Sequence, residues 1–359
     1  MSVHEREDAP PARVLEIKEP AVGLDAVVVI DHELFPIAAG GTRMVGDVTT
    51  DEVARLARAM TWKLAVCGVP YAGAKAGIRF DGGDRAAVLD AYLERVGEWR
   101  EFFLTGPDMG TQPEDFLRLE PRGGTTPMWA RAHEGMGMDD LAVGHGIKGA
   151  AIVALERLGR SLDGAAVAIE GFGKAGAGTA RACARAGARV VAVSTIEGAL
   201  VDPVGLDVDD LLELRTRHGD SLVRHGPAPV RPPAALFAAE CDVLVPGARP
   251  DVITPESADE LRCAAVVPVA NAPYAPGATD ALERHGILAL PDFVTNAGGV
   301  HLYEALECQQ DPERCLAAVE RLVRETTRRV LDASEAEGIT PTEAALRIAR
   351  EFLRRAQVP

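Results

Sequence analysis

Two lysines lie in one short apolar segment of this sequence, MTWKLAVCGVPYAGAKAGI, which covers residues 60–78. They are Lys63 and Lys75, and the 359-residue chain holds only five lysines among its 38 Lys and Arg. Arg keeps its charge in proteins, whereas a buried Lys amine can lose its proton. A Lys retained in apolar surroundings therefore indicates chemistry that a guanidinium cannot perform. Lys63 suits the binding of a carboxylate, and Lys75 suits proton exchange near neutral pH.

An acid in a turn is the third candidate for chemistry. Asp108 lies in LTGPDMGTQPEDF, residues 104–116, just before a helix that Pro113 is expected to open. A carboxylate there could move a proton to or from an amino group or water. Taken singly, Lys63 could extend to solvent, Lys75 could be an exposed loop residue and Asp108 could cap the next helix. The scarcity of Lys and the Gly-rich settings favour a functional role for the three together.

The elements that must position these residues follow from hydrophobic periodicity and from helix-start signals. Thr49 and Glu52 have capping-box spacing, and the apolar residues after them repeat on one helical face that also carries Lys63. The expected elements are strands at 13–19 and 26–31, a helix that begins after Thr49, a loop around Lys75 in VPYAGAKAGI (residues 69–78), and a helix at 84–104.

From about residue 145 the pattern changes to alternating strands and helices, which predicts a doubly wound parallel sheet. The apolar strand AAVAIE is followed at once by GFGKAG (Gly171, Phe172, Gly173, Lys174, Ala175 and Gly176) and then by a helix and a second strand. Glycines in this context favour a dinucleotide whose phosphates lie at the helix N-terminus. The second strand ends at Ser194 and Thr195, with Glu197 slightly later. Hydroxyl groups suit either a ribose hydroxyl or a 2′-phosphate, so both NAD and NADP stay open.

Composition narrows the partners. The formal net charge of −16 argues against nucleic acid or an anionic membrane and favours a small metabolite. The six cysteines show no framework spacing, the N-terminus has no apolar signal core, and no apolar run is long enough to span a bilayer. We therefore expect a cytoplasmic protein, and the scattered histidines predict no metal site.

Several motifs, taken in order, resemble the glutamate/leucine/phenylalanine/valine dehydrogenases. They are GGTRM (40–44), MTWK with AGAKAG, PDMGT (107–111), GFGKAG, ANAP (270–273) and PDFVTNAGGV (291–300). The resemblance covers residues 25–305 and implies NAD(P)-dependent oxidative deamination of an L-amino acid to a 2-oxo acid and ammonia. By the same resemblance, Lys63 would bind the α-carboxylate, Lys75 would activate water and Asp108 would move protons. Gly40, Gly41 and Met109 would line the substrate site, and Asn271 and Asn296 the nicotinamide site.

The resemblance also bears on the substrate. Members that use glutamate carry a lysine just before the GG pair, and Ala39 stands there in this chain. We therefore expect an apolar side chain, with Leu, Val, Phe and Trp as first candidates. Two alternatives stay open: a 2-hydroxy-acid dehydrogenase, for which His145 and His301 are the candidate bases, and a weakly catalytic cofactor-binding protein. The second alternative is motivated by Val143, which replaces the family's usual Thr.

The predicted architecture is α/β with two domains. A mixed α/β domain for substrate binding and oligomerisation covers residues 1–140, and a Rossmann NAD(P)-binding domain covers 141–324. The Gly- and Pro-rich stretch at 120–140 leads into the boundary. Two amphipathic helices, within residues 312–357, end the chain. We expect the C-terminal helical segment from about 325 to 359 to pack against the first domain. The family resemblance implies a homo-oligomer.

Overall fold

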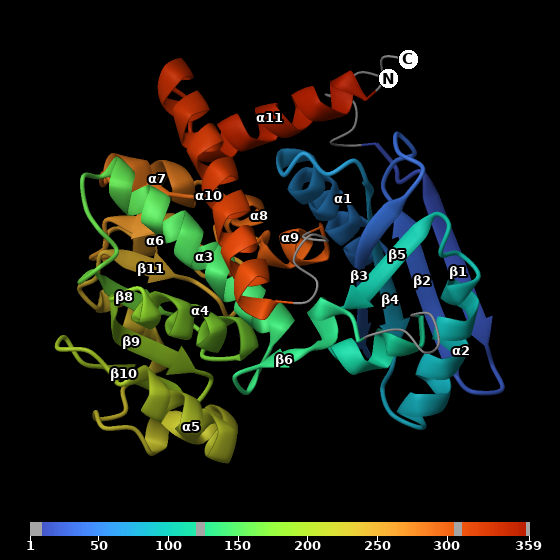
Figure 1. Ribbon diagram of the computed structural model, residues 1–359, viewed down its shortest axis with the longest axis horizontal. Coiled ribbons are helices and arrows are strands. Elements are labelled where there is room, and N and C mark those ends of the chain that lie inside the picture. The colour runs from blue at the N-terminus through green and yellow to red at the C-terminus, as the bar shows by residue number, and fades with distance from the viewer. Residues whose placement is uncertain (1–8, 120–125, 305–310, 357–359) are drawn as a thin grey trace. The chain divides into compact units, whose positions relative to one another are not determined.

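The chain folds into two compact units, seen in a computed structural model that describes residues 9–119, 126–304 and 311–356 (Figure 1). The first unit contains the residues up to Ala130 together with those from Ala345, and the second contains Arg131–Ala344. Residues 1–8 and 120–125, which the sequence analysis interpreted as part of the N-terminus and of the approach to the boundary, lie outside the described residues.

The first unit is built on a five-stranded mixed sheet of order β1-β2-β4-β3-β5. Strands β3, β4 and β5 are parallel, whereas β1 and β2 form an antiparallel hairpin that joins β4 along one edge. This confirms the two strands predicted first. The elements are β1 (Arg13–Glu19), β2 (Leu24–Ile30), β3 (Ala38–Val45), α1 (Thr50–Val66), β4 (Ala72–Arg79), α2 (Arg85–Gly97), β5 (Phe103–Pro107) and 3₁₀ helices at Pro113–Leu119 and Met128–Ala130.

The predicted loop around Lys75 is wrong, because residues 72–79 form β4, the central strand of this sheet. Gly73 and Gly77 point toward α1: a Cβ atom at Gly73 would lie 2.3 Å from the Thr61 backbone nitrogen, and one at Gly77 would lie 2.7 Å from Val53. The small residues that resembled loop composition are therefore those that let a helix lie directly on a strand.

The predicted helix at 84–104 is correct only as far as Gly97. The chain then turns, and Phe103–Pro107 forms β5, in which Phe103 pairs with Ala38 of β3. Aromatic, branched and Thr residues in FLT favour the extended strand once a neighbouring strand supplies the hydrogen bonds. This change of direction brings Asp108 to the end of a strand.

The last helix, α11 (Pro341–Arg355), contributes its residues from Ala345 to the first unit. The ring of Phe352 lies 5.9 Å from that of Phe35, and the guanidinium of Arg350 lies 5.9 Å from the Trp62 ring. The preceding helix, α10 (Pro312–Glu337), packs instead against α3 of the second unit. Both terminal helices were predicted, and only the second belongs with the N-terminal sheet.

The second unit contains a six-stranded sheet of order β10-β9-β8-β11-β12-β13, in which all neighbours are parallel except the β9–β10 pair. The strands are β8 (Ala166–Ile169), β9 (Arg189–Thr195), β10 (Gly198–Val201), β11 (Val243–Val245), β12 (Ala265–Val266) and β13 (Leu288–Ala289). The helices are α3 (Met138–Arg157), α4 (Lys174–Arg185), α5 (Val208–His218), α6 (Pro255–Ala258), α7 (Ala278–Arg284), α8 (Asp292–Thr295), α9 (Gly298–Glu304) and α10, and a short hairpin joins β6 (Ala132–His133) to β7 (Met136–Gly137).

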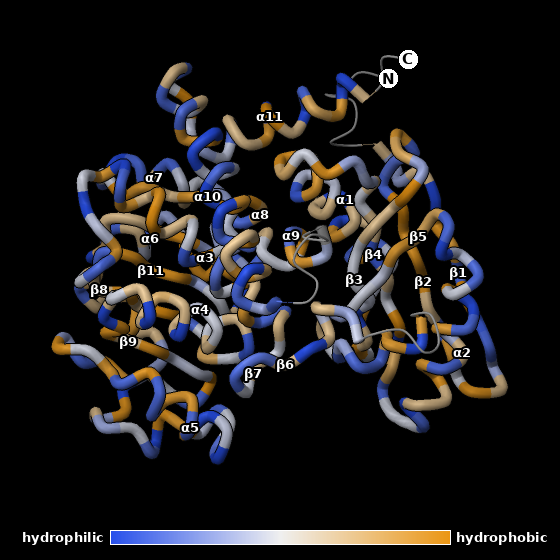
Figure 2. Tube along the Cα trace, in the orientation of Figure 1, coloured by the Kyte–Doolittle hydropathy of each residue, from blue (hydrophilic) through white to orange (hydrophobic). Residues whose placement is uncertain are grey.

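Side chains from this sheet enter two cores. Val167 and Ile169 of β8 pack into one core with residues of α3 and α4, and Ala168 between them packs into another with residues of α7. Successive strand residues point to opposite faces, so helices cover both sides. Figure 2 shows the apolar runs along strands such as β11 and the mixed hydropathy of α10 and α11. The predicted doubly wound sheet is confirmed.

Helix α3 approaches its neighbours closely through glycines. A Cβ atom at Gly144 would lie 2.3 Å from the Gly178 carbonyl carbon of α4, and one at Gly146 would lie 3.2 Å from Gly298 of α9. Backbones can come this near only where one side lacks a side chain. Across the described part of the chain, no helix is long and apolar enough to cross a membrane.

Candidate functional site

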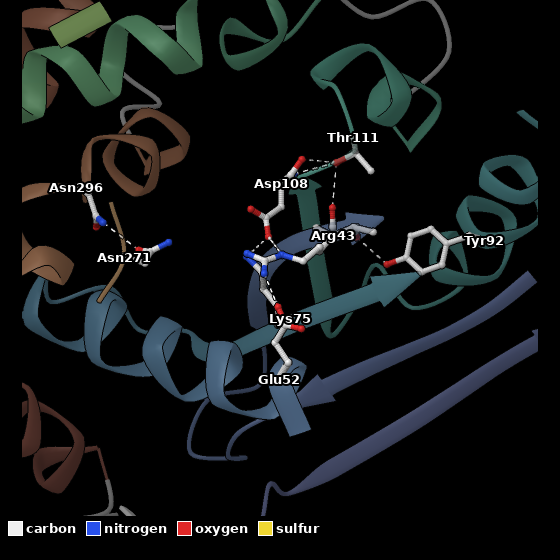
Figure 3. Close-up of polar contacts among 10 residues, drawn as sticks. Arg43, Glu52, Lys75, Tyr92, Asp108, Thr111, Asn271 and Asn296 are labelled. Atoms are coloured by element: carbon white, nitrogen blue, oxygen red, sulfur yellow. Dashed lines mark hydrogen bonds and ion pairs between the residues drawn. The ribbon is translucent and has the colours of Figure 1, made fainter. Parts of the chain in front are cut away.

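The structure brings two of the predicted site residues into direct contact. Lys75 Nζ lies 2.7 Å from Asp108 Oδ2, and their side chains are 11% and 24% exposed (Figure 3). Lys75 comes from the middle of the central strand β4, and Asp108 follows the last residue of β5. Two residues 33 positions apart thus form one amine–carboxylate pair, which can hold a proton between them.

Strand β3 lies between β4 and β5 and carries a glycine beside this pair. Its residue Gly41 pairs with Gly106 of β5, and a Cβ atom there would lie 3.4 Å from Lys75 Nζ and 3.1 Å from Asp108 Cβ. The preceding Gly40 has a separate reason to lack a side chain, because a Cβ atom would lie 1.7 Å from the Ala74 carbonyl oxygen. At Gly41 a Cβ atom would also lie 2.8 Å from the Pro107 carbonyl oxygen, so the GG pair permits close strand contact at both positions.

The turn that carries Asp108 is fixed to β3. Thr111 Oγ donates a hydrogen bond to the Thr42 carbonyl oxygen at 2.9 Å and accepts one from the Asp108 backbone N–H at 2.9 Å. Gly110, with φ of +79°, sits so close that a Cβ atom would lie 1.9 Å from the Met44 carbonyl oxygen. The motif PDMGT thus holds its carboxylate on a short, tightly bonded turn.

Two further charged residues, Arg43 and Glu52, complete the cluster, and the sequence analysis did not include them in the site. Arg43 Nε lies 3.4 Å from Asp108 Oδ2, and Arg43 Nη1 donates to Glu52 Oε1 at 2.5 Å. Thr49 caps α1 by accepting from the Glu52 backbone N–H, as predicted, while the Glu52 side chain turns to Arg43. A signal was available: Arg43 stands two residues after Gly41 in a strand, so both point to the same face.

Opposing effects set the charge of Asp108. Burial on its own would raise the pKa of this carboxyl, but the charge and hydrogen bond of Lys75, the charge of Arg43 and the Met109 backbone N–H together hold it below the usual value. The group is therefore a carboxylate at neutral pH and can accept a proton.

The other predicted substrate residues occupy different positions in the same unit. Lys63 lies half-buried in the last turn of α1, on the flank of the buried stripe formed by Val53, Ala57 and Leu64. Ala39 is half-buried on β3 and pairs with Gly73. Met109 is 58% exposed beside Asp108.

The predicted dinucleotide turn lies at the carboxyl end of β8. Gly171 has φ of +83°, and a Cβ atom at Gly176 would lie 1.9 Å from the Gly171 carbonyl oxygen. At Gly173, the N-cap of α4, a Cβ atom would meet nothing within 4 Å, so the helix N-terminus is open there. Strand order reverses between β8 and β11. An open helix N-terminus at such a reversal fits the pyrophosphate of NAD or NADP.

The remaining residues of this turn have distinct surroundings. Phe172 is buried in the core, while Lys174 is exposed and Ala175 is half-buried at the start of α4. Ser194 Oγ accepts from the Gly171 backbone N–H at 3.3 Å, and Thr195 Oγ donates to the Asp220 carbonyl oxygen at 2.7 Å. Both residues are buried, and the Ser194 hydroxyl contacts the turn directly through Gly171.

Asn271 and Asn296 contact each other, since Asn296 Nδ2 donates to Asn271 Oδ1 at 2.9 Å (Figure 3). Asn271 is exposed, whereas Asn296 is 8% exposed, and its Oδ1 is buried with no hydrogen-bond partner. A buried acceptor without a donor is costly unless a ligand supplies one. The carboxamide of a nicotinamide is a donor of the required kind.

A buried acid behind the dinucleotide turn was missed by the sequence analysis. Glu170 Oε2 accepts from the backbone N–H groups of Gly247 and Ala248, each at 3.1 Å. Burial raises the pKa of this carboxyl, although these two hydrogen bonds and Arg249 oppose the rise. Glu170 thereby joins the loops after β8 and β11. Its position directly before GFG was the available signal.

One group of side chains within the described ranges has the spacing of metal ligands. His133, Glu134 and Glu313 offer ligand atoms within 4.8 Å of one another. The Glu134 carboxylate, however, is already paired with both Arg181 and Arg185 at 2.5 Å. Two guanidinium groups on one ligand oppose the binding of a cation.

Comparisons with known proteins agree with both units. The family model of the glutamate/leucine/phenylalanine/valine dehydrogenases matches residues 135–358, and the model of the dimerisation domain of the same dehydrogenases matches residues 12–117. A glutamate dehydrogenase of Thermotoga maritima is 34% identical over 286 residues, which are 73% of this chain and 67% of that protein.

Solved structures show the same fold. The hetero-hexameric glutamate dehydrogenase of Thermus thermophilus, in a leucine-bound form, has a TM-score of 0.82 at 28% identity and covers 97% of this chain and 89% of its own. The L-tryptophan dehydrogenase of Nostoc punctiforme has a TM-score of 0.70 at 23% identity over 99% and 98% of the two chains.

The mixed sheet with its Lys–Asp pair and the Rossmann-type sheet occur here in an NAD(P)-dependent oxidoreductase that acts on CH–NH₂ donors. The chain belongs to the glutamate/leucine/phenylalanine/valine dehydrogenase family. Members of this family use NAD or NADP, which confirms the predicted cofactor class.

Proposed function

We propose that this chain catalyses the oxidative deamination of an L-amino acid with an apolar side chain. The amino acid, water and oxidised NAD or NADP give the 2-oxo acid, ammonia, the reduced cofactor and a proton. The observation that carries this proposal is the Lys75–Asp108 pair, which is largely buried and lies beside Gly41.

Each residue then has a distinct role. Lys63 binds the α-carboxylate of the substrate. Lys75, once deprotonated, takes a proton from the water that attacks the imine carbon, and the Asp108 carboxylate carries a proton to the departing nitrogen. Nicotinamide, when bound, accepts the hydride from the substrate α-carbon. Gly173 and the N-terminus of α4 would hold the cofactor phosphates, and Asn296 Oδ1 would be available to accept a hydrogen bond from the nicotinamide carboxamide.

The side-chain preference rests on Ala39, which is uncharged and half-buried on β3 two positions before Gly41. A substrate carboxylate would find no cation at that residue, so binding glutamate there would leave a charge unpaired. Leu, Val, Phe and Trp suit an apolar position. The relatives include enzymes named for glutamate and for tryptophan, so the family itself accommodates more than one substrate.

The 2-hydroxy-acid alternative finds little support in the histidines it requires. Burial lowers the pKa of His145 to about 4, with Lys148 adding to the effect, and burial likewise lowers the pKa of His301 to about 4. An imidazole whose protonated form has a pKa of about 4 is a weak base at neutral pH.

We also propose a homo-oligomer. The first unit matches the family's dimerisation domain, and one relative is described as a hetero-hexamer. Size-exclusion chromatography with light scattering tests this proposal, and a monomeric mass would contradict it.

A screen of the L-amino acids with NAD and NADP tests the proposed reaction. Reduced nicotinamide is read by absorbance, and the reverse reaction is run with each 2-oxo acid with and without ammonium. Turnover of Leu, Val, Phe or Trp, with a reverse reaction that needs ammonium, supports the proposal. Turnover of 2-hydroxy acids without ammonium, or cofactor binding with no turnover, contradicts it.

A further inference from the structure

Beyond the Lys75–Asp108 pair, the site contains a second cation whose role is not part of the reaction scheme above. We propose that Arg43, held by Glu52, is a positioning residue that keeps the Asp108 carboxylate in place and ionised while Lys75 loses and regains its proton. This inference rests on the proposed function, because that function requires Lys75 to change its protonation state.

The geometry places both cations on one oxygen. Lys75 Nζ lies 2.7 Å and Arg43 Nε 3.4 Å from Asp108 Oδ2. The Arg43 side chain is 15% exposed, so water screens its charge weakly. Asp108 therefore has two cationic neighbours when Lys75 is an ammonium and one when Lys75 is an amine.

The second cation must not titrate, and this explains the residue type. A guanidinium keeps its proton under all working conditions, whereas a second lysine could lose its own. With Arg43 in place, Asp108 remains a carboxylate after Lys75 has given up its proton, so it can accept the next one. Without Arg43, the neutral amine would leave a largely buried carboxyl with a weaker reason to stay ionised.

Glu52 fixes the direction of Arg43. It receives Arg43 Nη1 at 2.5 Å and stands in the first turn of α1, where Thr49 accepts from its backbone N–H. The cluster then contains two cations, Arg43 and Lys75, and two anions, Glu52 and Asp108. Removing Arg43 and removing Glu52 should therefore shift the proton equilibrium of Lys75 in opposite directions, which general loosening of the site would not do.

Acetylation of Lys75 as a function of pH tests this inference without requiring activity. The protein is treated with acetic anhydride at a series of pH values, and labelling is read by peptide mass spectrometry against exposed Lys18 as internal reference. For Arg43→Gln we expect the labelling midpoint of Lys75 to rise by about one pH unit. For Glu52→Gln we expect a fall of a few tenths of a unit.

The matched control is Arg79→Gln. Arg79 lies on the same strand as Lys75 and forms an ion pair with Asp25 at 2.9 Å, but its side chain is 36% exposed. This control should leave the Lys75 midpoint unchanged. An unchanged midpoint in Arg43→Gln, or shifts of the same sign in Arg43→Gln and Glu52→Gln, would overturn the inference.

The pH profile of turnover gives the second readout. With the amino acid found in the screen, Arg43→Gln should lower kcat more than it changes KM, and the acidic limb of kcat/KM should move to higher pH. Opposite labelling shifts in a protein that turns over no amino acid would leave the positioning role intact and refute the proposed reaction. Normal turnover with unchanged labelling midpoints would support the proposed reaction and refute the positioning role of Arg43.

An independent observation concerns two cysteines in the second unit. The Cys241 backbone N–H donates to the Arg262 carbonyl oxygen at 3.0 Å, just before β11 and β12 begin. The parallel β11–β12 register, in which Val243 pairs with Ala265, therefore extends back by two residues and places Cys241 opposite Cys263. Both side chains are half-buried and pack against the same core. We propose that these two residues form a reversible disulfide when a small-molecule disulfide is present.

The exchange balances in two steps. The Cys263 thiolate attacks one sulfur of the added disulfide, breaks its S–S bond and releases one thiol. The Cys241 thiol loses its proton to solvent and attacks the Cys263 sulfur, releasing the second thiol. Two protein thiols are oxidised and one small disulfide is reduced. Both cysteines precede their strands, so they lie at the amino ends of the strands, whereas the Gly171 turn lies at the carboxyl end of β8. Cofactor binding should therefore survive.

Incubation of the full chain with oxidised glutathione tests this second proposal. We expect a loss of two hydrogen masses, a cross-linked 241–263 peptide, a melting temperature raised by several degrees and unchanged NAD(P) binding. Cys263→Ser should abolish the cross-link, while Cys183→Ser, a buried cysteine elsewhere in the same unit, should preserve it. Glutathione adducts without the 241–263 cross-link would overturn it.

Discussion

Lys75 Nζ and Asp108 Oδ2 lie 2.7 Å apart although one residue belongs to a central strand and the other to the turn after an edge strand. Strand β3, between them, carries Gly41, where a Cβ atom would lie 3.1 Å from Asp108 Cβ and 3.4 Å from Lys75 Nζ. The pair is thus a product of sheet register, and each partner can be tested by itself.

Replacement of Lys75 by Ala should abolish most turnover and leave cofactor binding intact. Loss of a general base costs about 10²–10⁴-fold in kcat. Steady-state kinetics and titration with reduced cofactor measure the two effects. Lys18→Ala, in an exposed pair with Glu16, is the matched control and should behave as the parent protein. Turnover within a factor of two of the parent would remove Lys75 from the mechanism.

Asp108→Asn keeps the shape of the side chain but removes its ability to accept a proton. We expect kcat to fall by about 10²–10⁴-fold with a small change in KM. Asp115→Asn provides the comparison, because Asp115 lies in the 3₁₀ helix that follows and binds Arg85. If both variants lost activity equally, the effect of Asp108 would be structural.

Ala39→Lys should change the substrate range. A cation at this position of β3 would pair with a side-chain carboxylate, so kcat/KM for glutamate should rise relative to leucine, by about tenfold or more. The ratio of the two values is measured in one preparation, with Ala39→Met as a control for bulk. A larger effect of Met than of Lys on the glutamate-to-leucine ratio would argue against the assigned pocket.

The buried carboxyl of Asp140 should make the free energy of unfolding depend on pH. Burial, with the like charge of Asp139 next, raises its pKa to about 7 despite Lys174 and Arg215. An unfolded carboxyl titrates near pH 4. Between about pH 4 and 7 the native protein holds a proton that the unfolded chain has lost, so stability falls as the pH rises through this window.

Asp140→Asn should remove that dependence. The variant should gain on the order of 2–4 kcal/mol over the parent between pH 4 and pH 8, measured by urea unfolding at each pH. Asp210→Asn, an exposed acid in the first turn of α5, is the control. Parallel stability curves for Asp140→Asn and the parent would show that this carboxyl is ordinary.

Much of the fold was predictable because periodicity and helix signals are local. The strand–GFGKAG–helix pattern, the β1–β2 strands and the terminal helices all appear where the sequence placed them. The strand that carries Lys75 was not predictable in the same way. Its Ala and Gly residues have low strand propensity, and the two glycines are explained by the close approach of α1, which is a tertiary contact.

In the site, too, local features could be predicted from the sequence and tertiary contacts could not. Lys75 and Asp108 could be selected by residue type and setting, but their contact depends on the pairing of β3 with β4 and β5. Arg43 and Glu52 were missed because Glu52 already had a local explanation as part of a helix start. Its backbone serves that role, while its carboxylate forms a tertiary ion pair.

Placement of Lys75 in mid-strand limits how the amine can move. Strand β4 has hydrogen-bonded neighbours on both sides, so its amides should be among the slowest to exchange with deuterated solvent. Any reach toward a substrate must then come from torsions of the four-carbon side chain. Substrates would therefore be selected by whether they fit an amine whose backbone position is fixed.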